Sequence, residues 1–139
     1  MVGLTACETD KSGIGVTLSP GGEVEILVKT CRENATVKEI RLEDYRDGDD
    51  KAVVWRIVSR EGSALRAFTL GESPAGFETI QPLDEPSLLS TRVVAVVVTS
   101  EVKHQGVTFD PGKLRQGVVA MAASHELTTA EFAERSVCN

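Results

Sequence analysis

The sequence predicts an all-β domain, an antiparallel two-sheet sandwich of about seven or eight strands with a short C-terminal helix. Short segments alternate between apolar and polar residues, the period of a half-buried strand. Turn-forming Gly, Pro, Asp and Ser residues separate these segments roughly every eight to twelve residues, a spacing typical of sandwiches. A small closed barrel is the alternative that the same pattern allows.

We expect the first three strands over residues 14–18, 23–31 and 36–42. The first ends at the turn Ser19-Pro20-Gly21-Gly22. In the second, Val24, Ile26 and Val28 share one face and charged residues occupy the other. The third has imperfect apolar spacing, which indicates a bulge.

The middle of the chain continues the strand pattern. An acidic stretch over 44–51 is predicted to be a hairpin loop. The strand expected over 53–58 carries Trp55, which should be a central packing residue. Another strand is expected over 65–70, and the Pro- and Gly-rich residues 71–86 are predicted to cross the surface without regular structure.

The C-terminal part begins with residues 91–99, which are apolar on both faces and β-branched. We therefore expect a central strand that is covered on both sides. Residues 106–109 and 118–122 are predicted to form the last strand pair. Residues 128–135 are the expected helix, with Thr128 as its cap and Glu131 at the capping-box position.

Composition excludes some classes of function. The 139 residues carry a formal net charge of −6, and one Trp and one Tyr give no platform for stacking bases. We expect no nucleic-acid partner. The longest apolar run, from Val93 to Val98, is too short to span a bilayer as a helix.

Near the N-terminus, Leu4-Thr5-Ala6-Cys7 resembles a bacterial lipobox. The resemblance implies that Cys7 receives a lipid and anchors the protein to the outer face of the cytoplasmic membrane. The layout is similar to that of small secreted lipoproteins of high-GC Gram-positive bacteria. We therefore expect a basic and then apolar signal segment upstream, with residues 1–13 as signal remnant and polar tether and 14–139 as a single sandwich domain.

With Cys7 assigned to lipid, Cys31 and Cys138 remain as an even pair. We predict that they form a disulfide, as in many exported proteins; the alternative is two unpaired thiols. A loop of this size contributes roughly 4–5 kcal/mol in the chain-entropy model. The two histidines, His104 and His125, share no ligand-like spacing with these cysteines, so no metal site is expected.

A Cys in an early strand, a Trp in a middle strand and a late Cys resemble the immunoglobulin pattern, here Cys31, Trp55 and Cys138. The resemblance implies an immunoglobulin-like sandwich. Because Cys138 stands at the terminus instead of inside a late strand, the inter-sheet bridge of that family is not carried over.

Catalytic patterns are sparse. Ser124-His125-Glu126 has the residue types of a hydrolase, but members of a triad converge from separate segments. His104 lies in a predicted hairpin tip. The carboxylates of Asp44, Asp47, Asp49 and Asp50 lack the spacing of a calcium loop, which favours a solvated acidic turn.

We therefore expect a non-enzymatic binding or interaction module of the cell envelope without a cofactor. Its partner would be an envelope protein or a small ligand. The alternative is an envelope hydrolase or other enzyme that uses His125 or the acidic loop Asp44–Asp50. Residues 71–82 are the candidate binding segment, with Phe77 and Ile80 as its apolar residues; a plain crossover between sheets is the other interpretation of this length.

Overall fold

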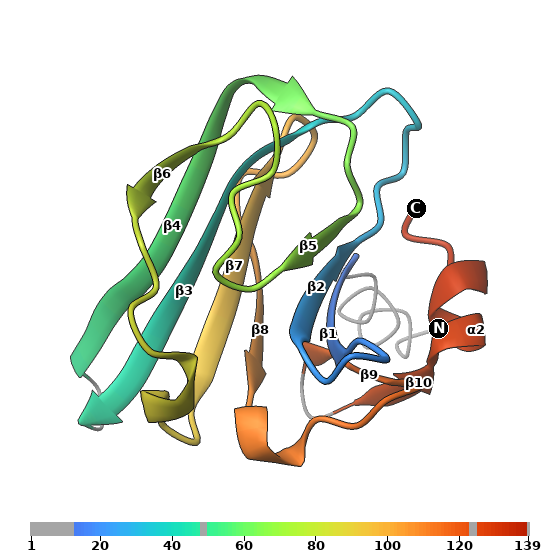
Figure 1. Ribbon diagram of the computed structural model, residues 1–139. Coiled ribbons are helices and arrows are strands. Elements are labelled where there is room, and N and C mark those ends of the chain that lie inside the picture. Colours follow the sequence, from blue (N-terminus) through green and yellow to red (C-terminus); the bar gives the residue numbers. More distant parts are fainter. Residues whose placement is uncertain (1–12, 48–49, 123–124, 139) are drawn as a thin grey trace.

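The protein folds as a β-sandwich of two five-stranded antiparallel sheets (Figure 1). The computed structural model describes residues 13–47, 50–122 and 125–138. Its elements, in chain order, are β1 (Ile14–Leu18), β2 (Val24–Val28), β3 (Val37–Asp47), β4 (Asp50–Ser63), β5 (Ala67–Thr69), β6 (Glu78–Gln81), η1 (Pro86–Leu88), β7 (Val93–Thr99), β8 (Gln105–Phe109), η2 (Pro111–Lys113), β9 (Val118–Ala120), β10 (Glu126–Thr128) and α2 (Thr129–Glu134).

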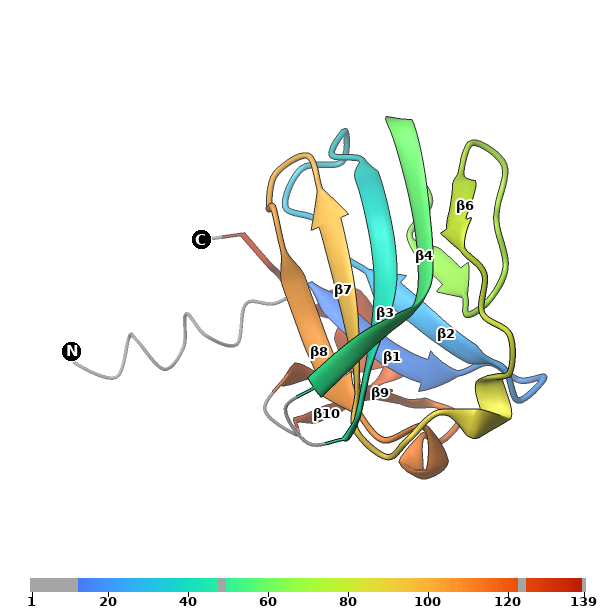
Figure 2. The same ribbon diagram turned by 90° about the vertical axis from the view of Figure 1, so that its left-hand side faces the viewer.

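The β1 sheet has the strand order β10-β9-β1-β2-β5, and the β3 sheet has the order β6-β4-β3-β7-β8. In Figure 2 the β3 sheet lies in front of the β1 sheet. Strands β1, β2 and β5 take the order of A, B and E in an immunoglobulin sandwich, while β4, β3, β7 and β8 take that of C′, C, F and G. The predicted fold class is confirmed, with β9 and β10 extending the β1 sheet.

The main core lies between the sheets and follows the alternation of the sequence. Ile14 and Val16 of β1 and Ile26 and Val28 of β2 point into it. Trp55 is 1% exposed and packs in the same cluster, as the sequence predicts. Strand β7 is interior to its sheet, and its alternate residues Val93, Ala95 and Val97 enter this core. On its other face Val96 is buried, while Val94 and Val98 on either side of it are half-buried.

A smaller apolar cluster lies on the outer face of the β1 sheet, under the C-terminal helix. Phe132 of α2 packs there with Val119 and Met121. The helix begins with the predicted capping box: the hydroxyl of Thr128 accepts from the Glu131 amide at 3.1 Å, and the Glu131 carboxylate accepts from the Thr128 amide at 2.8 Å. The Lys29 ammonium donates to the carbonyl oxygens of Ala133 and Arg135 at the other end of the helix.

The predicted disulfide joins Cys31, just after β2, to Cys138, with 4.8 Å between their Cα atoms. It therefore fixes the C-terminal tail beside the β1 sheet and does not cross between the sheets. Nearby, the Gly13 amide donates to the side chain of Gln105 at 3.0 Å, and the Cys31 amide donates to Glu101 at 2.6 Å. We call this the terminal end of the sandwich, and the opposite end, with the β3–β4 connection, η1 and η2, the hairpin end (Figure 1).

Three sequence predictions are wrong in detail. Most of the expected loop over 44–51 belongs to β3 and β4, which pair as far as Asp47 and Asp50. Residues 106–109 and 118–122 do not pair: β8 pairs with β7, and β9 pairs with β1 and β10. The segment 71–86 contains a short edge strand, β6, which pairs with β4. Within the described residues, no helix is long and apolar enough to cross a membrane.

Candidate functional site

A hollow of about 260 Å³ opens at the hairpin end, between β4 and the segment that follows β6. The described residues that line it are Asp44, Arg46, Val53, Val54, Gln81, Leu83, Asp84, Glu85, Leu88 and Leu89. We call it the Leu88 groove. It combines aliphatic side chains with carboxylates on one concave surface.

Two large aliphatic residues of the groove face solvent. Leu88 on η1 is 60% exposed, and Val53 on β4 is 42% exposed. A bulge in the β3–β4 pairing explains Val53: Leu42 pairs with Trp55 but Glu43 pairs with Val53. The extra residue, Val54, packs against the core, so that Val53 points outward. Single exposed aliphatic residues are common on proteins, but two on the same hollow indicate a surface for contact.

The groove wall is fixed to the end of β3 by polar contacts. The buried Asp44 carboxylate accepts from the Ser90 amide at 3.3 Å and from the Ser90 hydroxyl. Arg46 pairs with Asp44 at 3.4 Å and donates to the carbonyl oxygen of Leu88. These contacts hold η1 against the β3 sheet, so the exposure of Leu88 is a property of an anchored turn.

The same contacts occupy the carboxylate of Asp44, the first residue of the acidic loop Asp44–Asp50 that the catalytic alternative names beside His125. Asp44 accepts bonds from Ser90 and Arg46 and is only 4% exposed. Asp50 is exposed at the start of β4, while the Asp47 side chain and residues 48–49 lie outside the described part. In the described ranges, no group of three or more His, Cys, Asp or Glu residues could hold a metal ion.

The rim of the Leu88 groove is acidic. Asp84 and Glu85 are exposed, and neither side chain has a hydrogen-bond or ion-pair partner among the described residues. Arg46, the cation among the described lining residues, is paired with Asp44. The groove therefore offers uncommitted negative charge next to exposed aliphatic surface.

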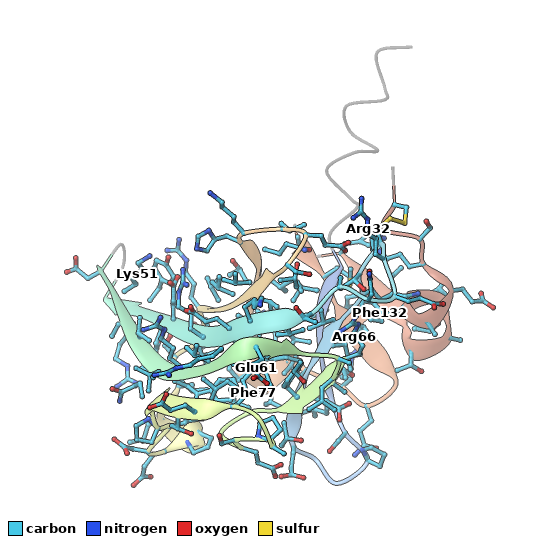
Figure 3. All side chains as sticks on the ribbon, turned by 90° about the horizontal axis from the view of Figure 1, so that it is seen from above. Arg32, Lys51, Glu61, Arg66, Phe77 and Phe132 are labelled. Carbon is cyan, nitrogen blue, oxygen red and sulfur yellow. A yellow bond between two sulfur atoms is a disulfide. The ribbon has the colours of Figure 1, made fainter. Side chains whose placement is uncertain are left out.

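A second polar cluster covers the outer face of the β3 sheet. Glu39 accepts from Arg56 at 2.9 Å and from Arg41 at 3.2 Å. Glu43 accepts from Arg41 at 2.8 Å and pairs with Lys51 at 3.4 Å. In Figure 3, Lys51 lies at the end of the sheet that is distant from Arg32.

These contacts shift the pKa values of the groups involved. The hydrogen bond from Arg56 lowers the pKa of Glu39 most; burial opposes it and Arg41 adds to it. For Glu43, burial alone would raise the pKa, but Arg41 and Lys51 outweigh it and the net pKa is lowered. Each acid has two cationic partners inside the cluster. The charges of this cluster are thus largely paired within it. The outer face of the β3 sheet is therefore a weaker candidate for binding a partner than the Leu88 groove.

The two candidate binding residues from the sequence, Phe77 and Ile80, differ in their exposure to solvent. Phe77 is half-buried and makes an edge-to-face contact with Phe68, with 5.5 Å between ring centroids. It lies near Glu61 (Figure 3) and packs against the main core. Ile80 is 48% exposed on β6, at the edge of the β3 sheet. Participation of either in binding stays a prediction.

The histidines are both exposed. His104 lies in the β7–β8 connection at the terminal end, and His125 lies just before β10. Within the described residues, neither ring has a hydrogen bond to a carboxylate or a hydroxyl. The structure thus brings no acid–base pair together around His104 or His125 in the part that it describes.

Sequence reasoning missed Leu88 and Val53, because the groove joins residues more than thirty positions apart through the bulge and the anchored turn. The pattern of Pro86 followed by Leu88 and Leu89 gave no signal of exposure. Cys7 lies outside the described residues, so its lipidation stays a prediction.

In comparisons with protein families, with curated proteins and with solved structures, nothing matches this chain. The proposals below therefore depend on the geometry of the molecule and on the sequence.

Proposed function

We propose that this domain is a non-enzymatic interaction module whose Leu88 groove docks a basic, apolar segment of a partner protein. The observation that carries the proposal is the pairing of Leu88, 60% exposed, with the uncommitted carboxylates of Asp84 and Glu85 on one hollow. A fitting partner carries one large apolar side chain flanked by Lys or Arg. The apolar side chain would enter the groove and the cations would face its rim.

The energetics of such docking are those of a small hot spot. Full burial of one Leu or Val side chain contributes roughly 1.5–3 kcal/mol, and a partner can cover the exposed 60% of Leu88 and 42% of Val53. Rim charges add mainly to the association rate and to selectivity against acidic partners. Because η1 is anchored through Asp44, Arg46 and Ser90, little ordering of the groove opposes binding.

We further propose that the protein is located outside the cytoplasm. The Cys31–Cys138 disulfide supports it, because structural disulfides persist mainly in oxidising compartments. Together with the lipobox-like Leu4-Thr5-Ala6-Cys7, it favours a lipid anchor on the outer face of the cytoplasmic membrane. Metabolic labelling with an alkyne fatty acid, in cells that make the chain with its native upstream sequence, tests this anchor. Label that is present in wild type and lost in Cys7→Ala supports it, and equal label in both contradicts it.

The groove itself is tested with designed peptides and isotope-labelled protein. One peptide places a central Leu between Lys residues, and a matched peptide replaces every Lys by Glu. We expect the Lys peptide to shift amide resonances of residues 81–89 and of Val53, and the Glu peptide to shift them at least tenfold more weakly at equal concentration.

Two variants distinguish binding in the groove from non-specific binding of the peptide. Leu88→Ser should abolish the shifts, whereas Leu65→Ser, at a residue 44% exposed on the β4–β5 connection, should leave them unchanged. Both substitutions are at exposed sites and should melt like wild type. Equal binding of the Lys and Glu peptides, or binding that survives Leu88→Ser, would overturn the proposal.

A further inference from the structure

A second hollow, of about 280 Å³, lies at the hairpin end between the two sheets. Its described lining comes from β8, the β8–β9 crossover with η2, β9, and the start of β10, together with Thr91. The lining residues are Thr91, Thr108, Phe109, Asp110, Lys113, Leu114, Arg115, Val118, Ala120, Met121, His125 and Glu126. It shares no described lining residue with the Leu88 groove.

The hollow exists because the sheets end at different places. The β1 sheet continues past β1 with β9 and β10, but the β3 sheet ends at β8. Val119 of β9 packs on the outer face with Phe132. Since side chains alternate along a strand, Val118 and Ala120 face inward, toward a position that no strand of the β3 sheet occupies in the described chain. This unfilled inner face is the apolar wall of the hollow.

The walls are held by named contacts. The hydroxyl of Thr17 donates to the carbonyl oxygen of Val118 at 2.7 Å, and the Gln116 side chain donates to that of Pro20 at 3.2 Å. Leu114 packs against the main core. The crossover is thus fastened to β1 and to the β1–β2 turn, and the hollow is preformed.

At the opening of the hollow, the acidic side chains have hydrogen-bond or ion-pair partners, whereas those of Lys113 and His125 have none among the described residues. Asp110 accepts from the Gly112 amide at 2.9 Å, and Glu126 pairs with Arg115 at 2.9 Å. Lys113 is therefore the cation at the opening whose ammonium is left for an anionic ligand, and the ring of His125 can donate a further hydrogen bond beside it.

We propose that this inter-sheet hollow binds a small amphipathic carboxylate. Its apolar part lies against Phe109, Leu114 and Val118, and its carboxylate meets Lys113 and His125 at the opening. This site goes beyond the groove and is independent of it, since neither needs the other to be occupied.

Hexanoate is the first probe, with hexylammonium and hexanol as isosteres of opposite and of no charge. Titrations followed by amide resonances should show hexanoate shifting Leu114, Val118 and Met121, at least tenfold more tightly than hexylammonium. Each methylene added from butanoate to hexanoate should tighten binding by about fourfold, the effect of one buried CH₂. Equal affinity for the anion and the cation would overturn the proposal, as would the absence of any dependence on chain length.

Variants locate the two halves of the ligand. Lys113→Gln should weaken hexanoate at least fivefold, while Lys103→Gln, an exposed lysine of the β7–β8 connection, should have no effect. Ala120→Leu should fill the hollow and abolish binding, with its spectrum showing that the fold is kept. Unchanged affinity in Lys113→Gln would remove the assigned head-group contact and with it the proposal. Hexanoate binding that persists in a folded Ala120→Leu variant would show that the ligand does not lie against the apolar wall, and would also overturn the proposal.

Discussion

Gly15 lies directly under the ring of Phe132, where no side chain fits. A Cβ atom at residue 15 would lie 3.0 Å from Cε1 of Phe132 and 2.2 Å from Cγ1 of Val119. Val119 is buried in the neighbouring strand and cannot move away without disturbing the small cluster. The close approach of α2 to the β1 sheet thus depends on the absence of a side chain at this position.

Gly15→Ala should therefore lower the free energy of unfolding by about 1–3 kcal/mol, the usual cost of overpacking. Gly21→Ala is the matched control, because a Cβ there meets only side-chain atoms at 3.7 Å or more. Urea denaturation of both variants measures the difference. A Gly15→Ala protein as stable as the control would mean that α2 does not sit on β1.

The disulfide should add stability by constraining the unfolded chain. Its cysteines are 107 positions apart, and the chain-entropy model gives roughly 4–5 kcal/mol for such a loop. Cys138→Ser should lose up to this amount and should speed hydrogen exchange first at Phe132 and Arg135. Peptide mapping of oxidised wild type should recover Cys31 joined to Cys138, with Cys7 free in protein made without its signal. A disulfide that contains Cys7 would contradict the assignment.

Truncation of Trp55 tests the packing of β4. At 1% exposure its side chain fills the space between the sheets, so Trp55→Ala should cost about 3–5 kcal/mol. Trp55→Phe should cost less, because most of the volume is retained. Thermal melts of the two variants give the order, and a normal melt for Trp55→Ala would refute the burial.

Acid should weaken the cluster on the outer face of β3. Because the pKa of Glu39 is lower in the folded protein than its ordinary value of 4.5, its contribution to stability is present above that pH and is lost as the pH falls through the lowered value. The stability difference between wild type and Glu39→Gln should therefore shrink below about pH 4.5. Glu61→Gln, at an exposed residue of the same sheet, is the control. Denaturation curves at several pH values measure this, and a difference that is constant with pH would exclude the linkage.

The sequence predicted the strands in which side-chain alternation coincides with burial. Ile14, Val16, Ile26 and Val28 alternate cleanly, and their strands appear where expected. Thr128 and Glu131 located the helix, since a capping box is a local contact. Strand β6 carries no such signal, because all four of its residues are exposed at a sheet edge.

Pairings between distant segments could not be predicted from local pattern. Residues 118–120 pair with β1, about a hundred positions away, because the chain crosses from one sheet to the other after β8. The Leu88 groove has the same origin: it needs the bulge at Val54 and the Asp44–Ser90 contact, neither of which is a property of one segment. The candidate sites were therefore beyond sequence reasoning, although the fold class was not.

Because the terminal and hairpin ends lie at opposite ends of the sandwich, a lipid on Cys7 would orient the domain relative to the membrane. The six residues Glu8 to Gly13 span at most about 20 Å when fully extended. A lipid on Cys7 would thus keep the terminal end, with its disulfide and the start of β1, close to the membrane surface. The Leu88 groove and the inter-sheet hollow, both at the hairpin end, would then lie on the side of the domain that is distant from the bilayer.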